Sequence, residues 1–119
     1  METKIKSFRD LKIWKEGIEL VKKTYLLTKE FPKEERYGLS SQMQRASVSI
    51  PSNVAEGFRR KYNKEYKQFL NIALGSCAEL ETQIVIAQEL KYIKDEQAKD
   101  IIELIYYICR MIVSLKKKL

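Results

Sequence analysis

The chain contains no histidine among its 119 residues, which removes most of the chemistry that helical proteins carry. Serine and cysteine triads of the usual kind, histidine-ligated zinc and the Glu-x-x-His di-iron motif all require an imidazole. Glycine is scarce as well, and the four glycines stand singly at Gly17, Gly38, Gly57 and Gly75, so they form no phosphate-cradling loop. These absences predict a protein that is not an enzyme and that holds no metal or cofactor.

Cysteine and long hydrophobic runs are also scarce. Cys77 and Cys109 form no C-x-x-C motif, so we interpret both as free, packed thiols. Residues 1–10 are charged and lack the apolar segment of a signal peptide, which favours a cytoplasmic location. The most apolar stretch, residues 101–115, is shorter than the ~20 residues that span a bilayer and contains Glu103 and Arg110. We therefore expect no membrane partner.

The composition suits one helical domain, and its charge suits a polyanionic partner. Hydrophobic residues make up 45% of the chain and charged residues 33%, which fits a single domain over residues 1–119 that buries a sizeable core. The formal net charge is +7. Such an excess favours a polyanion, although basic proteins without one are also common.

Apolar residues recur every three to four positions in four segments, which predicts four helices. We expect the first from Phe8 or Asp10 to Thr28, with an apolar stripe of Leu11, Trp14, Ile18, Val21 and Tyr25. A loop follows over residues 29–38, and the second helix begins near Leu39 with Ser40 as its N-cap. The third is expected from Asn63, its N-cap candidate, to about Tyr92, and the fourth from Asp95 to residues 116–118.

The second helix contains Pro51, which removes one backbone hydrogen bond. The pattern stays in phase on both sides of Pro51, so a kink is expected and a break is not. One stripe of this helix is apolar or small: Leu39, Met43, Ala46, Ile50, Val54 and Gly57. The neighbouring stripe is polar, and we interpret Arg45, Ser49, Asn53 and Glu56 as a structural polar network that fixes the helix register.

The same region carries a family resemblance. The stretches Phe31-Pro32, Tyr37-Gly38-Leu39, Arg45-Ala46 and residues 49–57 (SIPSNVAEG) resemble the signature of the 23S rRNA intervening-sequence protein family, and the match continues through residues 69–81. The resemblance implies an antiparallel up-down four-helix bundle that assembles into a homo-oligomeric, typically pentameric, ring with a basic surface. Some members are encoded inside rRNA genes. Others, the accessory variability determinants of diversity-generating retroelements, accompany a reverse transcriptase and its template RNA.

The last two helices carry more apolar surface than one core requires. The main apolar stripe of the third helix consists of Tyr66, Phe69, Leu70, Ala73, Cys77, Leu80 and Ile84, and that of the fourth consists of Ile101, Leu104, Ile105, Ile108, Ile112 and Leu115. Ile72, Ile86 and Leu90 lie away from the main stripe of the third helix, and a second apolar face follows the fourth: Ile102, Tyr106, Cys109 and Val113. A soluble monomer rarely exposes a large apolar patch. This surplus independently predicts self-association.

The strongest functional candidate lies between the second and third helices. Residues 58–67 (FRRKYNKEYK) combine five basic residues and one acidic residue with aromatic residues, the mixture that grips phosphates and stacks unpaired bases. The candidate nucleic-acid-binding residues are Arg59, Arg60, Lys61, Lys64 and Lys67. A further basic surface would arise if Lys4, Lys6, Arg9, Lys12 and Lys15 cluster in space.

Two functions remain open from the sequence. The leading hypothesis is a non-catalytic, homo-oligomeric accessory protein that binds nucleic acid, RNA in preference to DNA, and that assists a reverse transcriptase and its template RNA. The alternative is a homo-oligomeric protein-interaction scaffold with no nucleic-acid role, whose charge serves solubility.

Overall fold

Four amphipathic segments form four helices in the computed structural model, which describes residues 5–119. The elements, in chain order, are η1 (Phe8–Asp10), α1 (Lys12–Thr28), η2 (Lys33–Glu35), α2 (Leu39–Phe58), α3 (Asn63–Glu89) and α4 (Asp95–Lys117), where η1 and η2 are short 3₁₀ turns. This described part of the chain contains no strand. The all-α, four-helix prediction is therefore confirmed, with the first helix shortened by η1 and the third ending before Tyr92.

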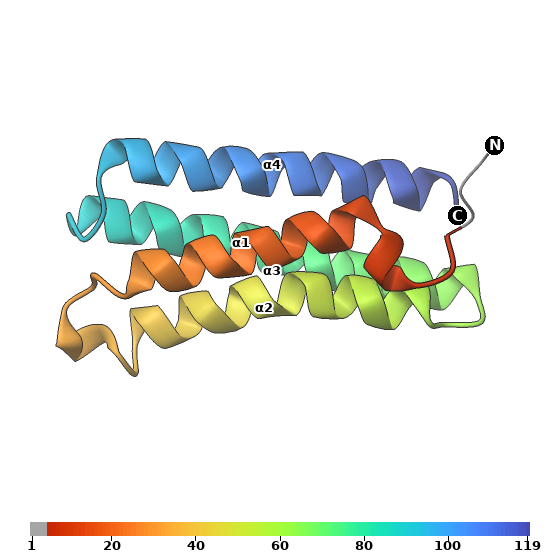
Figure 1. The fold of residues 1–119 in the computed structure, drawn as a ribbon, viewed down its shortest axis with the longest axis horizontal. Helices are drawn as coiled ribbons and strands as arrows, with labels where there is room; N and C mark the ends of the chain where they lie inside the picture. Colours follow the sequence, from red (N-terminus) through yellow and green to blue (C-terminus); the bar gives the residue numbers. More distant parts are fainter. Residues whose placement is uncertain (1–4) are drawn as a thin grey trace.

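The helices form a four-sided bundle in which each helix packs against its neighbours in the chain (Figure 1). Contacts join α1 to α2, α2 to α3, α3 to α4 and α4 to α1. The bundle measures 47 × 27 × 20 Å, so its long axis follows the helices. The α1–α2 and α3–α4 connections lie at one end in Figure 1, and the α2–α3 connection lies at the other.

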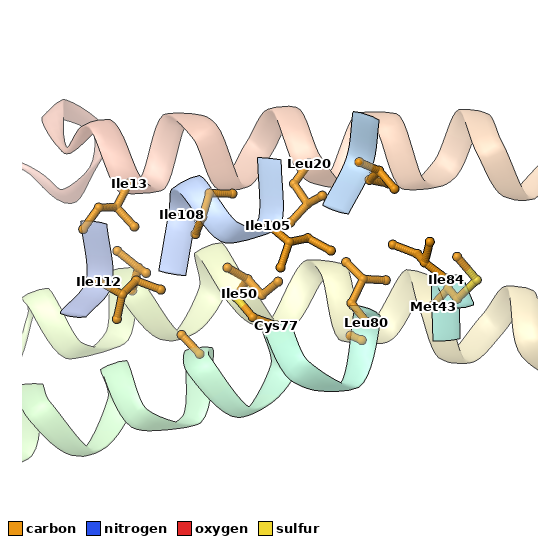
Figure 2. Close-up of a cluster of buried hydrophobic side chains, with 14 of the residues drawn as sticks. Ile13, Leu20, Met43, Ile50, Cys77, Leu80, Ile84, Ile105, Ile108 and Ile112 are labelled. Carbon is orange, nitrogen blue, oxygen red and sulfur yellow. The ribbon is translucent and has the colours of Figure 1, made fainter. Parts of the chain in front are cut away.

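The core runs along the bundle axis and takes large side chains from every helix (Figure 2). Leu20, Ile50, Leu80 and Ile105, one from each helix, have no solvent exposure. Burying an aliphatic side chain of this size stabilises the fold by about 1.5–3 kcal/mol. The main stripes predicted for α2, α3 and α4 supply most of these buried residues, which confirms those three faces.

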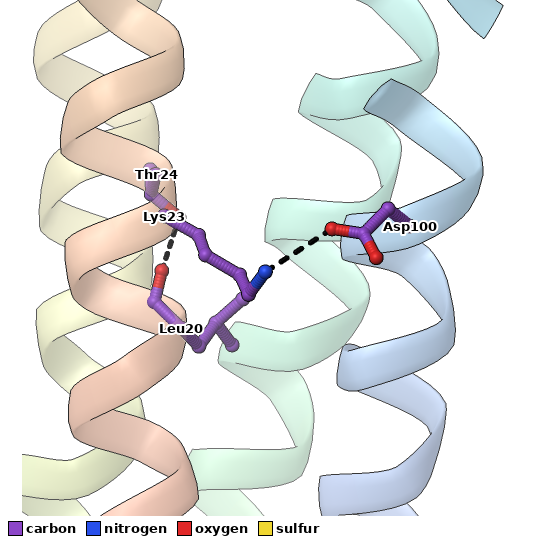
Figure 3. Close-up of polar contacts among 4 residues, drawn as sticks. All are labelled: Leu20, Lys23, Thr24 and Asp100. Atoms are coloured by element: carbon purple, nitrogen blue, oxygen red, sulfur yellow. Dashed lines mark hydrogen bonds and ion pairs between the residues drawn. The ribbon is translucent and has the colours of Figure 1, made fainter. Parts of the chain in front are cut away.

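The predicted apolar face of α1 is wrong by about one residue. The buried positions are Ile13, Gly17, Leu20, Thr24 and Thr28, whereas Tyr25 is 42% exposed. Thr24 can be buried because its Oγ1 donates a hydrogen bond to the carbonyl oxygen of Leu20 at 2.8 Å (Figure 3). The threonines therefore sit on the core side, and the hydrophobicity pattern alone pointed to the neighbouring edge of the helix.

Pro51 lies inside an unbroken α2 and is buried. Its ring packs closely on Gly17 of α1, because a Cβ placed on Gly17 would lie 3.0 Å from Cβ of Pro51. The Ser47 hydroxyl does not replace the hydrogen bond that Pro51 removes. It donates instead to the carbonyl oxygen of Gln44 at 2.8 Å. The kink itself stays a prediction, whereas the continuity of the helix is observed.

The start of α2 differs from the predicted cap. Ser40 lies within the helix and is buried, and Gly38 occupies the N-cap position. The backbone N–H of Leu39 donates to Oε1 of Glu35 at 3.2 Å, while the Tyr92 hydroxyl donates to Oε2 of Glu35 at 2.9 Å. The Glu35 carboxylate thus satisfies the helix end and joins it to the α3–α4 connection. The same hydrogen bond raises the pKa of the Tyr92 hydroxyl.

The surplus apolar surface predicted for the last two helices is present in part. Ile72 and Ile86 of α3 and Leu90, directly after it, are 43–51% exposed, and Tyr106 and Val113 of α4 are similarly open. The other two residues of the predicted second face of α4, Ile102 and Cys109, are half-buried against the core. α3 is also the one described helix that reaches the length and mean hydropathy of a membrane span, with 1.2 over its most apolar window. Here it packs between α2 and α4 as a wall of the bundle (Figure 1).

The two cysteines are free thiols that meet between α3 and α4, a proximity that their sequence spacing did not indicate. Cys77 is buried and Cys109 is half-buried. The hydrogen bond that Cys77 donates to Cys109, together with burial, raises the pKa of Cys77. Accepting that bond lowers the pKa of Cys109.

Gly57 provides a test of helix spacing. A Cβ at Gly57 would lie 2.8 Å from Cδ1 of Tyr66 and 3.0 Å from Cβ of Phe69, whereas a Cβ at Gly75 would meet nothing within 4 Å. Both Gly→Ala changes gain about 1 kcal/mol of helix propensity, but only Gly57→Ala adds overpacking of about 1–3 kcal/mol. We therefore expect the free energy of unfolding in urea to be about 1–3 kcal/mol lower for Gly57→Ala than for Gly75→Ala. Equal stabilities would contradict the α2–α3 spacing.

Thiol labelling tests the cysteine pair. Because Cys109 is more accessible and has the lower pKa, iodoacetamide should modify it before Cys77 in the folded protein. The Cys77→Ala variant removes the hydrogen-bond donor, so alkylation of Cys109 should then require a higher pH. Peptide mass spectrometry across pH would detect both effects, and faster labelling of Cys77 would contradict the arrangement.

Candidate nucleic-acid interface

The candidate interface is the basic corner, residues 58–67, where α2 ends and α3 begins. The helices are joined by residues 59–62, so three basic side chains lie on the connection itself and two on the first turns of α3. Four of the five cations are exposed: Arg59, Arg60, Lys61 and Lys64. Lys67 is half-buried. The structure therefore places all five predicted residues at one end of the bundle (Figure 1).

The three cations on the connection lie against aromatic rings. The guanidinium carbon of Arg59 lies 5.4 Å from the ring centroid of Phe8, and that of Arg60 lies 4.6 Å from the ring of Phe69. Nζ of Lys61 lies 5.6 Å from the ring of Tyr62. Exposed contacts of this kind contribute about 0.5–1 kcal/mol, so they orient the cations while leaving their charge available.

Carboxylates do not neutralise this corner. Among residues 5–119 the ion pairs within 4.0 Å are Lys22 with Glu19 and Lys23 with Asp100, the second of which joins α1 to α4 (Figure 3). α3 begins at Asn63 after Tyr62, and no side chain caps its first N–H groups. Asn63 is thus the first helical residue and not the cap. The positive end of the α3 dipole adds to the five cations and favours an anion here.

The aromatic residues of the corner divide into buried and open ones. Phe58 and Tyr66 are half-buried and pack edge to face, with ring centroids 6.3 Å apart. Tyr62 is 61% exposed. Only Tyr62 therefore offers an open ring for stacking, while Phe58 and Tyr66 close the end of the core.

The N-terminal segment adds Lys6 of the predicted basic group to this corner. A hollow of about 350 Å³ is lined by Lys6, Ser7, Phe8, Phe58 and Arg59. Lys12 instead lies over the ring of Tyr107, 5.4 Å from its centroid. Lys4 lies outside the described residues.

The predicted polar network of α2 is smaller than expected and includes α3. Nδ2 of Asn53 donates to the carbonyl oxygen and to Oγ of Ser49, and Oγ of Ser76 donates to Oγ of Ser49 at 2.8 Å. Arg45 and Glu56 are exposed and take no part in it. The network therefore joins α2 to α3 through neutral groups, while the charged side chains of Arg45 and Glu56 stay in water.

A second group of basic and aromatic residues, which was not predicted, lies at the opposite end of the bundle. Arg36 and Tyr37 lie in the α1–α2 connection, with Tyr25 of α1 beside the same hollow. The guanidinium carbon of Arg36 lies 5.3 Å from the ring centroid of Tyr37. The adjacent Arg-Tyr pair is the sequence feature that could have indicated this group. The acidic residues at positions 30, 34 and 35 lower the net charge of the segment, so the segment does not stand out as basic.

The fold and the corner define a helical-bundle protein with a basic, aromatic end and, among residues 5–119, no cluster of side chains suited to a metal. The model of the family described as 23S rRNA-intervening sequence protein matches residues 9–114, and the chain belongs to this family. No curated protein matches it.

A solved structure shares the fold. It is a crystal structure of a protein of unknown function from the S23 ribosomal protein family of Bacteroides thetaiotaomicron, 22% identical in sequence, with a TM-score of 0.79. The match covers 88% of this chain and 98% of that one. The similarity extends over almost the whole bundle, so the helical arrangement described above is one that another protein adopts.

Proposed function

We propose that this chain is a non-catalytic, homo-oligomeric protein that binds nucleic acid, RNA in preference to DNA, through the basic corner. The observation that carries the proposal is the set of five cations at one helix junction, none of them paired with a carboxylate among residues 5–119. Three of them lie over aromatic rings and the N-terminus of α3 is uncapped. The family name refers to 23S rRNA, which makes RNA the first probe.

Self-association would bring several copies of the basic corner together in one assembly. A second copy would cover the exposed apolar residues Ile72 and Ile86 of α3 and Leu90 directly after it, since a monomer gains nothing from leaving them in water. A ring, a pentamer in this proposal, would present one corner per subunit. Weak phosphate contacts then add along one polyanion because each further contact is intramolecular. Such a ring would hold template RNA beside a reverse transcriptase.

The exposed apolar surface of α3 and α4 also favours a second candidate, a homo-oligomeric scaffold that docks another protein. Ionic strength separates the two functions. Phosphate binding releases counterions and weakens as salt rises, whereas docking through an apolar face does not.

A salt titration tests the corner. Labelled structured RNA would be titrated at several salt concentrations with the wild type and a variant in which Arg59, Arg60, Lys61, Lys64 and Lys67 are Gln. Each phosphate contact to a single strand contributes about −0.7 to the slope of log K against log salt, so losing five should flatten the slope by about 3.5.

The control for this titration carries the same loss of charge at exposed lysines away from the corner: Lys22→Gln, Lys23→Gln, Lys91→Gln, Lys94→Gln and Lys99→Gln. We expect this control to keep most of the wild-type slope. If both variants lose the same amount of salt slope, the corner contributes only net charge and is not a binding site. If the wild type binds no RNA, the scaffold function is favoured instead.

A mass measurement tests self-association. We expect light scattering to give a multiple of the 14.1 kDa subunit, five-fold for a pentamer. The double variant Ile72→Glu with Ile86→Glu should reduce that mass, because two carboxylates would be buried unpaired at the interface. Gln42→Glu with Ser52→Glu adds the same charge at exposed polar positions of α2, outside the apolar surface of α3 and α4, and should leave it unchanged. A wild-type protein of one subunit mass would overturn the proposal.

A further inference from the structure

A very exposed tyrosine marks the end of the bundle opposite the basic corner. Tyr37 is 86% exposed, the largest value among the large hydrophobic residues that are open to solvent. It lies between η2 and the start of α2, so the helices do not require an aromatic ring there. Arg36 covers it at 5.3 Å, which orients the ring and places a cation beside it. This pair forms a platform with no partner in the fold.

The platform borders the first of two hollows that share residues. The first, of about 600 Å³, includes Tyr25, Lys29, Lys33, Arg36 and Tyr37 in its lining. The second, of about 460 Å³, continues along α1 and α2 to Arg45. Tyr25, Ser41 and Gln44 line both hollows, so they join into one groove. We call it the tyrosine groove, defined by Tyr25, Lys29, Lys33, Arg36, Tyr37 and Arg45.

The groove is cationic because the nearby carboxylates are directed elsewhere. Its lining contains four basic side chains and no acidic one. Both oxygens of Glu35 accept hydrogen bonds, from Leu39 and Tyr92. Glu30 lines a separate hollow between α1 and α4, and Glu34 lies outside the groove lining. A polyanion would therefore meet attraction along the whole groove.

The floor of the groove is partly apolar, with Phe31, Pro32 and Val48 in its lining, and its polar groups are held in place. Nε2 of Gln44 donates to Oγ1 of Thr28 at 3.1 Å, and Oγ1 of Thr28 donates to the carbonyl oxygen of Tyr25 at 3.2 Å. Ser40 and Ser41 add hydroxyl groups to the lining. The floor thus combines fixed hydrogen-bonding groups with two tyrosine rings, and these groups suit the edges and faces of unpaired bases.

We propose that the tyrosine groove binds a single-stranded stretch of RNA, with bases stacked on Tyr37 and Tyr25 and the backbone held by Lys29, Lys33, Arg36 and Arg45. This proposal rests on RNA binding by the chain and goes further, because it places unpaired nucleotides at a site distinct from the basic corner. The two sites lie at opposite ends of a bundle 47 Å long (Figure 1). Duplex RNA offers no unstacked base, so the groove selects single strands.

The test compares two probes, a short oligouridine and a base-paired RNA duplex of the same length. We expect Tyr37→Ala to weaken oligouridine binding about tenfold, the scale of losing one stacked base, and to leave duplex binding unchanged. Tyr37→Phe keeps the ring and should bind like the wild type. Leu26→Ala removes another exposed apolar side chain, one that lies outside the groove lining and the basic corner, and serves as the matched control. Circular dichroism and light scattering would confirm that each variant keeps its fold and mass.

Photo-crosslinking gives a second measurement that does not depend on variants. Oligouridine that contains 4-thiouridine should crosslink to peptides with Tyr25 or Tyr37. Crosslinks confined to residues 58–67, or equal oligouridine binding by Tyr37→Ala and wild type, would overturn the groove while leaving RNA binding intact. Failure of the wild type to bind either RNA would overturn both proposals. A change of subunit assembly in Tyr37→Ala would also overturn the groove, since it would then be a contact between copies.

Discussion

The Pro51 ring packs on Gly17 so closely that a methyl group at that position would force the neighbouring atoms to shift, and this contact sets how close α2 lies to α1. At its C-terminal end α2 meets α3 through Gly57, against Tyr66 and Phe69. Proline is unfavourable inside a helix, and glycine is a weak helix former. Here Pro51, Gly17 and Gly57 are nevertheless the residues that bring the helix backbones together. The burial of Ile50 and Val54 on the same helix offsets this cost in helix propensity.

Both candidate RNA surfaces are attached to the ends of this one helix. The connection before α2 carries Arg36 and Tyr37, and Glu35 fixes that end by accepting hydrogen bonds from Leu39 and Tyr92. The connection after α2 carries the three cations of the basic corner. α2 packs against both α1 and α3, so one helix joins the two surfaces along the length of the bundle.

Sequence periodicity predicted the four helices and the core faces of α2, α3 and α4, since a helix that is buried on one side repeats its apolar residues at a fixed spacing. It failed on α1, where Thr24 takes a core position by bonding its hydroxyl to Leu20 and Tyr25 turns outward. The basic corner was found because its residues are adjacent in the chain. The tyrosine groove was missed because Tyr25, Tyr37 and Arg45 become neighbours only when α1 packs on α2.

The placement of the cations favours a nucleic-acid partner over solubility alone. The net charge of +7 is little offset by the fold, because both ion pairs found among residues 5–119 are exposed and such pairs contribute about 0–1 kcal/mol each. Charge that served only solubility would act equally well anywhere on the surface. Here cations lie over the rings of Tyr37 and Tyr62, which are 86% and 61% exposed and oppose solubility. A partner that presents both phosphates and aromatic bases accounts for the pairing of these two residue types, whereas a solvated surface accounts for only one.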